Sequence, residues 1–159
     1  MSPPDRPKGE CESVQRDPST ASTAGDVGVG AGPGTARGSC HCGRVRFVAT
    51  FPSRFVAHCH CASCRRAHGA AFVTWAGFPA PQVRVTAGAG DLATHESSPS
   101  TYRRFCRHCG TKRFFESSRW PGEIHVVLAA FDDPVDRAPS VHAFYEEHAS
   151  WLPALKDPP

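Results

Sequence analysis

The chain has 159 residues, a length that fits a single domain, and its 18 lysines and arginines against 15 acidic residues give a formal charge of +3. No stretch approaches the ~18–20 consecutive apolar residues of a membrane-spanning helix, which excludes the membrane-embedded classes. A basic start followed by an apolar run, the mark of a secretory signal, is also absent. We therefore expect a cytoplasmic protein that has no membrane partner.

The first 36 residues differ in composition from the rest of the chain. Up to residue 38 the only branched aliphatic side chains are three valines, and no aromatic residue precedes Phe47. Such a segment buries too little apolar surface to offset the entropy lost on ordering. We predict a disordered tail rich in Pro, Gly and Ser over 1–36, a folded domain over 37–152 and a short C-terminal tail over 153–159.

Most segments of the predicted domain have the pattern of short β-strands. Residues 44–48 alternate charged and apolar side chains, which is typical of a half-buried strand, and Pro52 ends it. Residues 62–67 can form one helical turn. Further strands are predicted at 71–78, 82–86, 92–96, 101–105, 111–115, 123–131 and 141–145. The most apolar run, 123–131, is predicted as the central strand, and Trp151 is expected to pack the end of a mostly β domain.

Seven of the eight cysteines fall into three short groups, and only Cys11 stands apart, in the predicted tail. The groups are Cys40 and Cys42, then Cys59, Cys61 and Cys64, then Cys106 and Cys109. In a chain without an export signal, such spacings indicate metal ligands rather than disulfides. The sequence therefore predicts two zinc ions per chain, bound by seven thiolates.

The first and last groups together supply a complete set of ligands for one zinc. Structural zinc sites are tetrahedral and take four protein ligands, often as two pairs from separate segments. Glycines beside both pairs let the backbone turn around a metal. We predict a closed structural zinc site formed by Cys40, Cys42, Cys106 and Cys109.

The middle group, Cys59, Cys61 and Cys64, supplies three ligands and leaves two interpretations. In the first, a histidine closes a second structural site. The candidates are His58, His60, His68 or a more distant histidine. In the second, the fourth position stays open for a water or a thiol, which a bound zinc can activate. The spacing alone does not choose between them.

The net charge gives little support for nucleic-acid binding, because seven thiolates and two Zn²⁺ would bring +3 to about zero. We therefore expect no nucleic-acid partner. A local basic cluster remains around residues 65–66 and 103–107. Arg65 and Arg66 follow the middle cysteine group, and they either bind a substrate carboxylate or form a solvated face that offsets the thiolates.

Three segments taken together resemble the glutathione-dependent formaldehyde-activating (GFA) family, which also includes centromere protein V. They are 38–47, 59–70 and 104–111, with the cysteines in the same order and spacing. The resemblance implies a β-tent fold of short antiparallel sheets with one structural and one three-cysteine zinc. It also implies condensation of formaldehyde with glutathione to S-(hydroxymethyl)glutathione, formally a carbon–sulfur lyase reaction, with the glutathione sulfur at the open zinc position. Residues 64–67, Cys-Arg-Arg-Ala, differ from the Cys-Trp-Lys-Pro of the formaldehyde-activating prototype.

Two functions follow from these observations. We favour a carbon–sulfur lyase-like enzyme for a glutathione-like thiol and a small aldehyde, with Cys59, Cys61 and Cys64 as its catalytic zinc ligands. The alternative is a zinc-stabilised binding module that contacts protein or nucleic acid through its arginine-rich face. An open metal site beside a pocket would support the enzyme, whereas a fourth protein ligand and a flat basic face would support the module.

Overall fold

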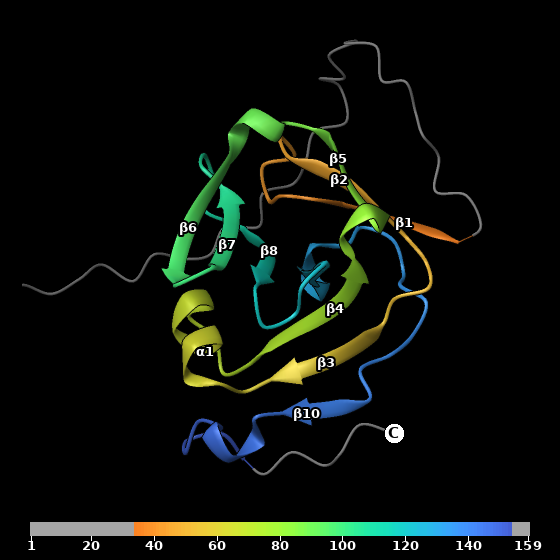
Figure 1. Cartoon of the computed structure of the whole chain (residues 1–159). Helices are drawn as coiled ribbons and strands as arrows, with labels where there is room; N and C mark the ends of the chain where they lie inside the picture. Colours follow the sequence, from red (N-terminus) through yellow and green to blue (C-terminus); the bar gives the residue numbers. More distant parts are fainter. Residues whose placement is uncertain (1–33, 154–159) are drawn as a thin grey trace, which may run out of the picture.

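The computed structural model describes residues 34–153, so the predictions made for 1–33 and 154–159 lie outside the described residues. The chain forms a three-stranded sheet, in the order β1-β2-β5, and a seven-stranded sheet, in the order β10-β3-β4-β9-β8-β7-β6. The small sheet lies at the opposite end of the molecule from helix α1 (Ala62–His68) and β10 (Figure 1). The predicted mostly β fold is confirmed. None of the helices in the described part of the chain could span a membrane.

The small sheet begins earlier than the composition suggested. It is antiparallel and consists of β1 (Thr35–Ser39), β2 (Arg46–Thr50) and β5 (Val83–Ala87). Two residues predicted as tail therefore belong to β1, where Ala36 is fully buried. A side chain at Gly38 would clash with the ring of Phe47. The prediction counted large apolar residues and so missed a strand whose packing requires small ones.

The large sheet carries most of the predicted strands. Its members are β3 (Phe55–Cys59), β4 (Val73–Pro79), β6 (Leu92–Ser98), β7 (Thr101–Cys106), β8 (Lys112–Ser117), β9 (Glu123–Val127) and β10 (Val141–Ala143). Short 3₁₀ helices come after β4, β5, β9 and β10. They are η1 (Ala80–Gln82), η2 (Ala89–Asp91), η3 (Leu128–Ala130) and η4 (Tyr145–Glu147). Strand β9 is central, as predicted, but it ends four residues early because the chain turns into η3. Strand β10 pairs with β3 in parallel, so the sheet is not wholly antiparallel.

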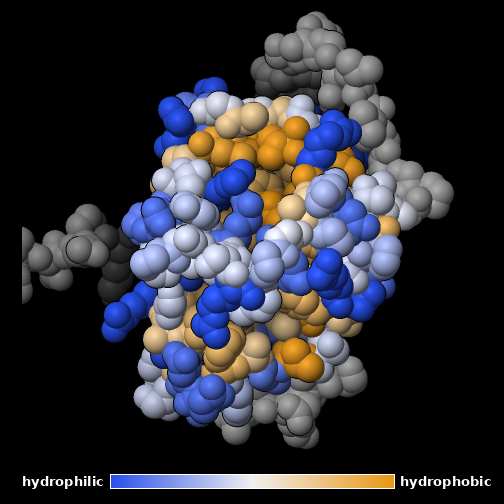
Figure 2. Space-filling model, viewed as in Figure 1, coloured by the Kyte–Doolittle hydropathy of each residue, from blue (hydrophilic) through white to orange (hydrophobic). Residues whose placement is uncertain are grey.

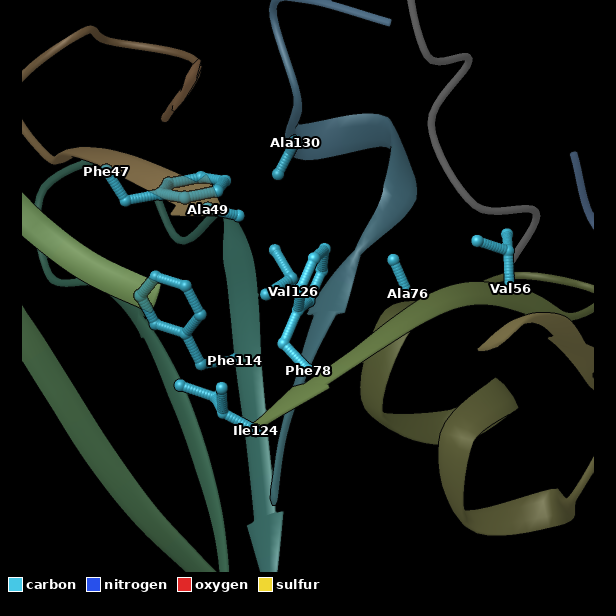
Figure 3. Packing of buried hydrophobic residues seen from close by; sticks show 9 residues of the cluster. All are labelled: Phe47, Ala49, Val56, Ala76, Phe78, Phe114, Ile124, Val126 and Ala130. Atoms are coloured by element: carbon cyan, nitrogen blue, oxygen red, sulfur yellow. The ribbon is translucent and has the colours of Figure 1, made fainter. Parts of the chain in front are cut away.

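The main core fills the space between the two sheets. From the small sheet, Phe47 and Ala49 point toward Phe78 on β4, Phe114 on β8 and Val126 on β9 (Figure 3). The rings of Phe47 and Phe114 pack edge to face with centroids 5.3 Å apart. Seen from outside, hydrophobic residues gather beside β2 and β5, near the top of Figure 2. The interior packing thus fixes the two sheets against each other and leaves the far end of the large sheet to form a site.

The end of the domain differs from the prediction made for Trp151. That side chain is 72% exposed and does not pack the core. A small residue, Ala149, is the buried side chain in this region. The chain reaches this point after β10, which pairs with β3, and the single turn η4, and Trp151 then lies on the surface.

Arg113 on β8 is a buried charge without a polar partner. The residue is fully buried, and none of its three guanidinium nitrogens makes a hydrogen bond. The ring of Phe47, 5.7 Å from the guanidinium carbon, is the compensating contact among the described residues. Burial of an ion without a hydrogen-bonded counter-ion costs several kcal/mol. Arg113 therefore destabilises the fold in which it is buried.

We expect Arg113→Met to raise the free energy of unfolding by about 2 kcal/mol, because methionine keeps an unbranched stem and removes the unpaired charge. Denaturant unfolding followed by circular dichroism measures the change. Arg104→Met on the neighbouring strand is the matched control. Arg104 is partly exposed and pairs with Glu116 at 2.9 Å, so its loss should change stability by less than ~1 kcal/mol. Unchanged or lower stability of Arg113→Met would contradict this account.

Candidate metal centres and cavity

The four cysteines predicted to form a closed site come together where two turns meet. Within 4.8 Å of one another lie the Sγ atoms of Cys40, Cys42, Cys106 and Cys109. The two turns have matching hydrogen bonds, since the Cys40 amide donates to the Val45 carbonyl at 3.0 Å and the Cys106 amide to the Thr111 carbonyl at 3.1 Å. Gly110 has a φ of +71°, which a residue with a side chain adopts only with strain. Each turn thus points a pair of sulfurs toward the other.

Hydrogen bonds favour the thiolate form of two residues of this four-cysteine cluster, Cys40 and Cys109. The Val45 amide donates to Cys40 Sγ at 3.2 Å, and Thr111 Oγ1 lies 3.1 Å from Cys109 Sγ. Burial opposes ionisation of both thiols, yet these hydrogen bonds lower the pKa of Cys40 and bring the pKa of Cys109 to about 5. Two of the four sulfurs thus have donors that favour ionisation, and four cysteine sulfurs are a ligand set that suits a soft divalent ion such as zinc.

The three remaining cysteines of the domain meet at the start of α1. Cys59 is the last residue of β3, and Cys61 is the N-cap of α1, where its Sγ accepts a hydrogen bond from the Cys64 amide at 3.3 Å. The Sγ atoms of all three lie within 4.8 Å of one another. The predicted helical turn therefore forms, ends one residue later than expected, and gathers the three sulfurs into a three-cysteine cluster.

The histidines proposed as a fourth ligand point elsewhere. His58 Nδ1 lies 2.8 Å from Thr74 Oγ1 on β4, and His60 Nε2 lies 2.8 Å from His142 Nδ1 on β10. His68 packs edge-on against an indole ring. Among residues 34–153, no histidine or carboxylate joins the three sulfurs as a fourth potential ligand. The interpretation with an open position matches this arrangement.

A cavity of about 390 Å³ lies beside the three-cysteine cluster. The cysteines line it from one side, and an aromatic wall faces it from the large sheet. That wall consists of Phe55, Trp75, Phe115, Trp120 and His125. Ala143, Phe144 and Glu147, from β10 to η4, close a further side, and Arg103 and Arg119 add positive charge. This cavity was not predictable from the sequence, because its lining comes from segments that are distant along the chain.

Arg103 extends from β7 to the three-cysteine cluster. It is 6% exposed, and its two terminal nitrogens each lie 3.9 Å from Cys64 Sγ. One of them also donates to Ser63 Oγ at 3.1 Å, and Nε donates to Ser97 Oγ at 3.2 Å. The sequence placed this arginine only in a basic cluster. Its neighbours Tyr102 and Arg104 are more exposed, so the inward position of Arg103 is a property of the folded sheet that the sequence does not display.

The three thiols share their negative charge unequally. Hydrogen bonding from Cys59 is the main reason that the pKa of Cys64 is lowered to about 5, and Cys61 and Arg103 add to this effect against burial. The same contact raises the pKa of Cys59, and burial raises that of Cys61. The protein alone therefore favours one thiolate, and a bound cation is needed to ionise all three.

Arg65, a candidate either for binding a substrate carboxylate or for a solvated face, donates two hydrogen bonds to backbone carbonyls. Its Nε donates to the His60 carbonyl at 3.0 Å and one terminal nitrogen to the Glu147 carbonyl at 2.9 Å. The Glu147 carboxylate in turn accepts from the Ala62 amide at 2.8 Å. Arg66 lines a separate, more open groove. Arg65 thus ties the cysteine-bearing loop to the C-terminal wall of the cavity.

Comparisons with known proteins agree with this arrangement. Residues 35–147 match the family described as "Glutathione-dependent formaldehyde-activating enzyme". A protein of Halomonas elongata named "Putative glutathione-dependent formaldehyde-activating enzyme" is 29% identical over 123 residues, which cover 72% of this chain and 78% of that protein. A crystal structure of a Rhodobacter sphaeroides protein is similar with a TM-score of 0.57 and 26% identity, covering 67% of this chain and 99% of the other. With the match extending from β1 to η4, this chain belongs to the glutathione-dependent formaldehyde-activating enzyme family.

Proposed function

We propose that the protein is a zinc-dependent carbon–sulfur lyase that joins a glutathione-like thiol to a small aldehyde such as formaldehyde. The observation that carries this proposal is a three-thiol cluster, without a fourth ligand among the described residues, in the wall of a cavity. The cavity volume of about 390 Å³ falls within the range of ~300–1,000 Å³ typical of small-molecule sites. The family description and the name of the relative support glutathione and formaldehyde as the substrate classes.

In this proposal each cysteine cluster has its own role. The four-cysteine cluster would hold a structural zinc, and Cys59, Cys61 and Cys64 would hold the second one. A zinc bound there lowers the pKa of an incoming thiol and keeps it as a thiolate. In the reaction, a lone pair of the thiolate forms the carbon–sulfur bond to the aldehyde carbon. The π electrons of the carbonyl move to its oxygen, which takes up the proton that the thiol released.

The residues of the chain prepare the cavity for this chemistry. The ring of Trp75 is buried beside the cluster, and Phe115 flanks it with ring centroids 5.8 Å apart, so both limit the access of water to the reacting sulfur. His125 is nearly buried, and burial lowers its pKa against the pull of Glu123, so its ring is neutral at neutral pH. The aromatic wall therefore has no charged imidazole at neutral pH.

The proposal is tested by asking whether a free thiol reaches the second metal. We expect the metal-loaded protein to contain two metals per chain, and glutathione to shift the visible absorption bands of the cobalt-substituted form. S-methylglutathione, which differs by blocking the sulfur, is the matched control and should leave the bands unchanged. The same preparation with zinc should accelerate adduct formation from glutathione and formaldehyde, measured by nuclear magnetic resonance. If glutathione and S-methylglutathione give the same cobalt absorption bands, and the zinc form does not accelerate adduct formation, the proposed enzyme is refuted.

A further inference from the structure

Arg103 is a buried cation, and its guanidinium contacts the three-cysteine cluster at Cys64. We propose that Arg103 is the counter-ion of this cluster, and that its charge lets the site accept an anionic sulfur as the fourth ligand. The inference rests on the proposed function in one respect, since it takes the fourth ligand to be a thiolate. It adds to that function the residue that makes such a ligand acceptable.

The first argument is the missing charge partner of Arg103. A buried arginine is normally paired with a carboxylate, because an isolated buried charge is costly. The side-chain nitrogens of Arg103 instead donate to Ser63, Ser97 and Cys64, and no carboxylate forms an ion pair with it in the described part of the chain. The sulfur of Cys64 is thus the one contacted group that can carry a full negative charge.

The second argument is the charge of the loaded site. Three thiolates around a divalent ion leave one net negative charge, and a fourth thiolate makes two. Both charges would lie in a cavity with an aromatic wall, where the penalty for net charge is large. A guanidinium beside Cys64 offsets one of them. Without it, the site would disfavour an anionic ligand more strongly than a neutral one.

The third argument is that the guanidinium is held in place before any ligand enters. Ser97 on β6 and Ser63 on α1 fix its orientation from two sides, and the ring of Phe115 lies 4.9 Å from its central carbon. Arg103 also lines the cavity, so its field acts on an occupant. A fixed, planar cation needs no rearrangement when a thiolate binds.

The test compares an anionic with a neutral ligand. A counter-ion favours the anionic ligand selectively, whereas a purely structural residue affects the binding of both ligands equally. The full chain, loaded with cobalt, is titrated with glutathione and separately with imidazole, which binds metals as a neutral molecule. We expect Arg103→Met to lower the affinity for glutathione relative to that for imidazole by about tenfold or more. Arg103→Lys, which keeps the charge, should recover a large part of the loss. Arg104→Met is the matched control and should behave as the wild type.

A second readout separates failure of this inference from failure of the proposed enzyme. Retention of the second metal against a chelator should weaken about tenfold in Arg103→Met and be unchanged in Arg104→Met, because the counter-ion also favours the three thiolates. If the wild type binds no thiol, the proposed enzyme fails, and loss of metal in Arg103→Met still supports the counter-ion. If Arg103→Met lowers the affinities for glutathione and imidazole equally, or leaves metal retention unchanged, the counter-ion proposal is overturned. Arg103 would then have only a structural role.

Discussion

Cys106→Ser should remove one of the two metals and leave a protein without a cooperative unfolding transition. Cys106 is fully buried at the end of β7, and its cluster joins the β1–β2 turn to the β7–β8 turn. These turns belong to different sheets. Structural zinc contributes ~10–16 kcal/mol in small zinc-binding peptides, whereas a whole domain is stable by only ~5–15 kcal/mol. Loss of one ligand therefore removes an amount comparable with the total stability.

Thermal unfolding by circular dichroism and native mass spectrometry measure the two effects of this substitution. Cys11→Ser is the matched control, since Cys11 belongs to none of the three cysteine groups of the sequence. It should keep both metals and the wild-type transition. Two retained metals and an unchanged melting curve in Cys106→Ser would show that the four-cysteine cluster does not stabilise the fold through a metal.

Cys61→Ser should abolish adduct formation while the fold survives. The ligands of this site come from one short segment, 59–64, whose strand β3 is held by β4 and β10 through backbone hydrogen bonds. Serine is also a good N-cap, so its hydroxyl can accept the hydrogen bond from the Cys64 amide that Cys61 Sγ accepts now. The exchange removes a metal ligand and keeps the start of α1.

The measurements are the rate of S-(hydroxymethyl)glutathione formation, the metal content and the unfolding curve. For Cys61→Ser we expect adduct formation at the uncatalysed rate and one bound metal instead of two. Its melting temperature should stay within a few degrees of the wild type. Cys61→Ala removes the cap together with the ligand, and it should lose about 1 kcal/mol more than Cys61→Ser. If Cys61→Ser unfolds as completely as Cys106→Ser, both clusters are structural, and the binding module replaces the enzyme.

The parts of the fold that local patterns determine were predictable from the sequence. The alternation at 44–48 predicts a strand, and β2 lies there with a shift of two residues. The apolar run at 123–131 predicts a central strand, and β9 is central although it ends at Val127. The cysteine spacing predicts the four-cysteine cluster and the three-cysteine cluster that the structure brings together. The strands are encoded within one short segment each, and the four-cysteine cluster is encoded as two short paired spacings whose ligands complete one zinc site.

Features that arise from packing between distant segments were not predictable. In β1, Ala36 is fully buried and the Phe47 ring leaves no room for a side chain at Gly38, and no count of apolar side chains records that. Arg103 reaches Cys64 across two elements about forty positions apart in the chain. The neighbouring Arg104 has the same chemistry and instead pairs with Glu116 on β8. Which of two adjacent arginines turns inward depends on the pairing of β7, and the sequence does not display that register.

The pairing of β10 with β3 means that one side of the cavity becomes available only late in synthesis on the ribosome. Synthesis delivers the last ligand of the four-cysteine cluster at Cys109, well before the segment that holds Ala143 and Glu147. The His60 amide binds the Ala143 carbonyl at 2.9 Å, and Glu147 caps the turn that carries the three cysteines. A nascent chain can therefore bring together the four-cysteine cluster first, while the three-cysteine cluster remains uncovered. The cavity closes only when residues 143–147 emerge, so a truncated translation product would have the three sulfurs but lack one side of the cavity.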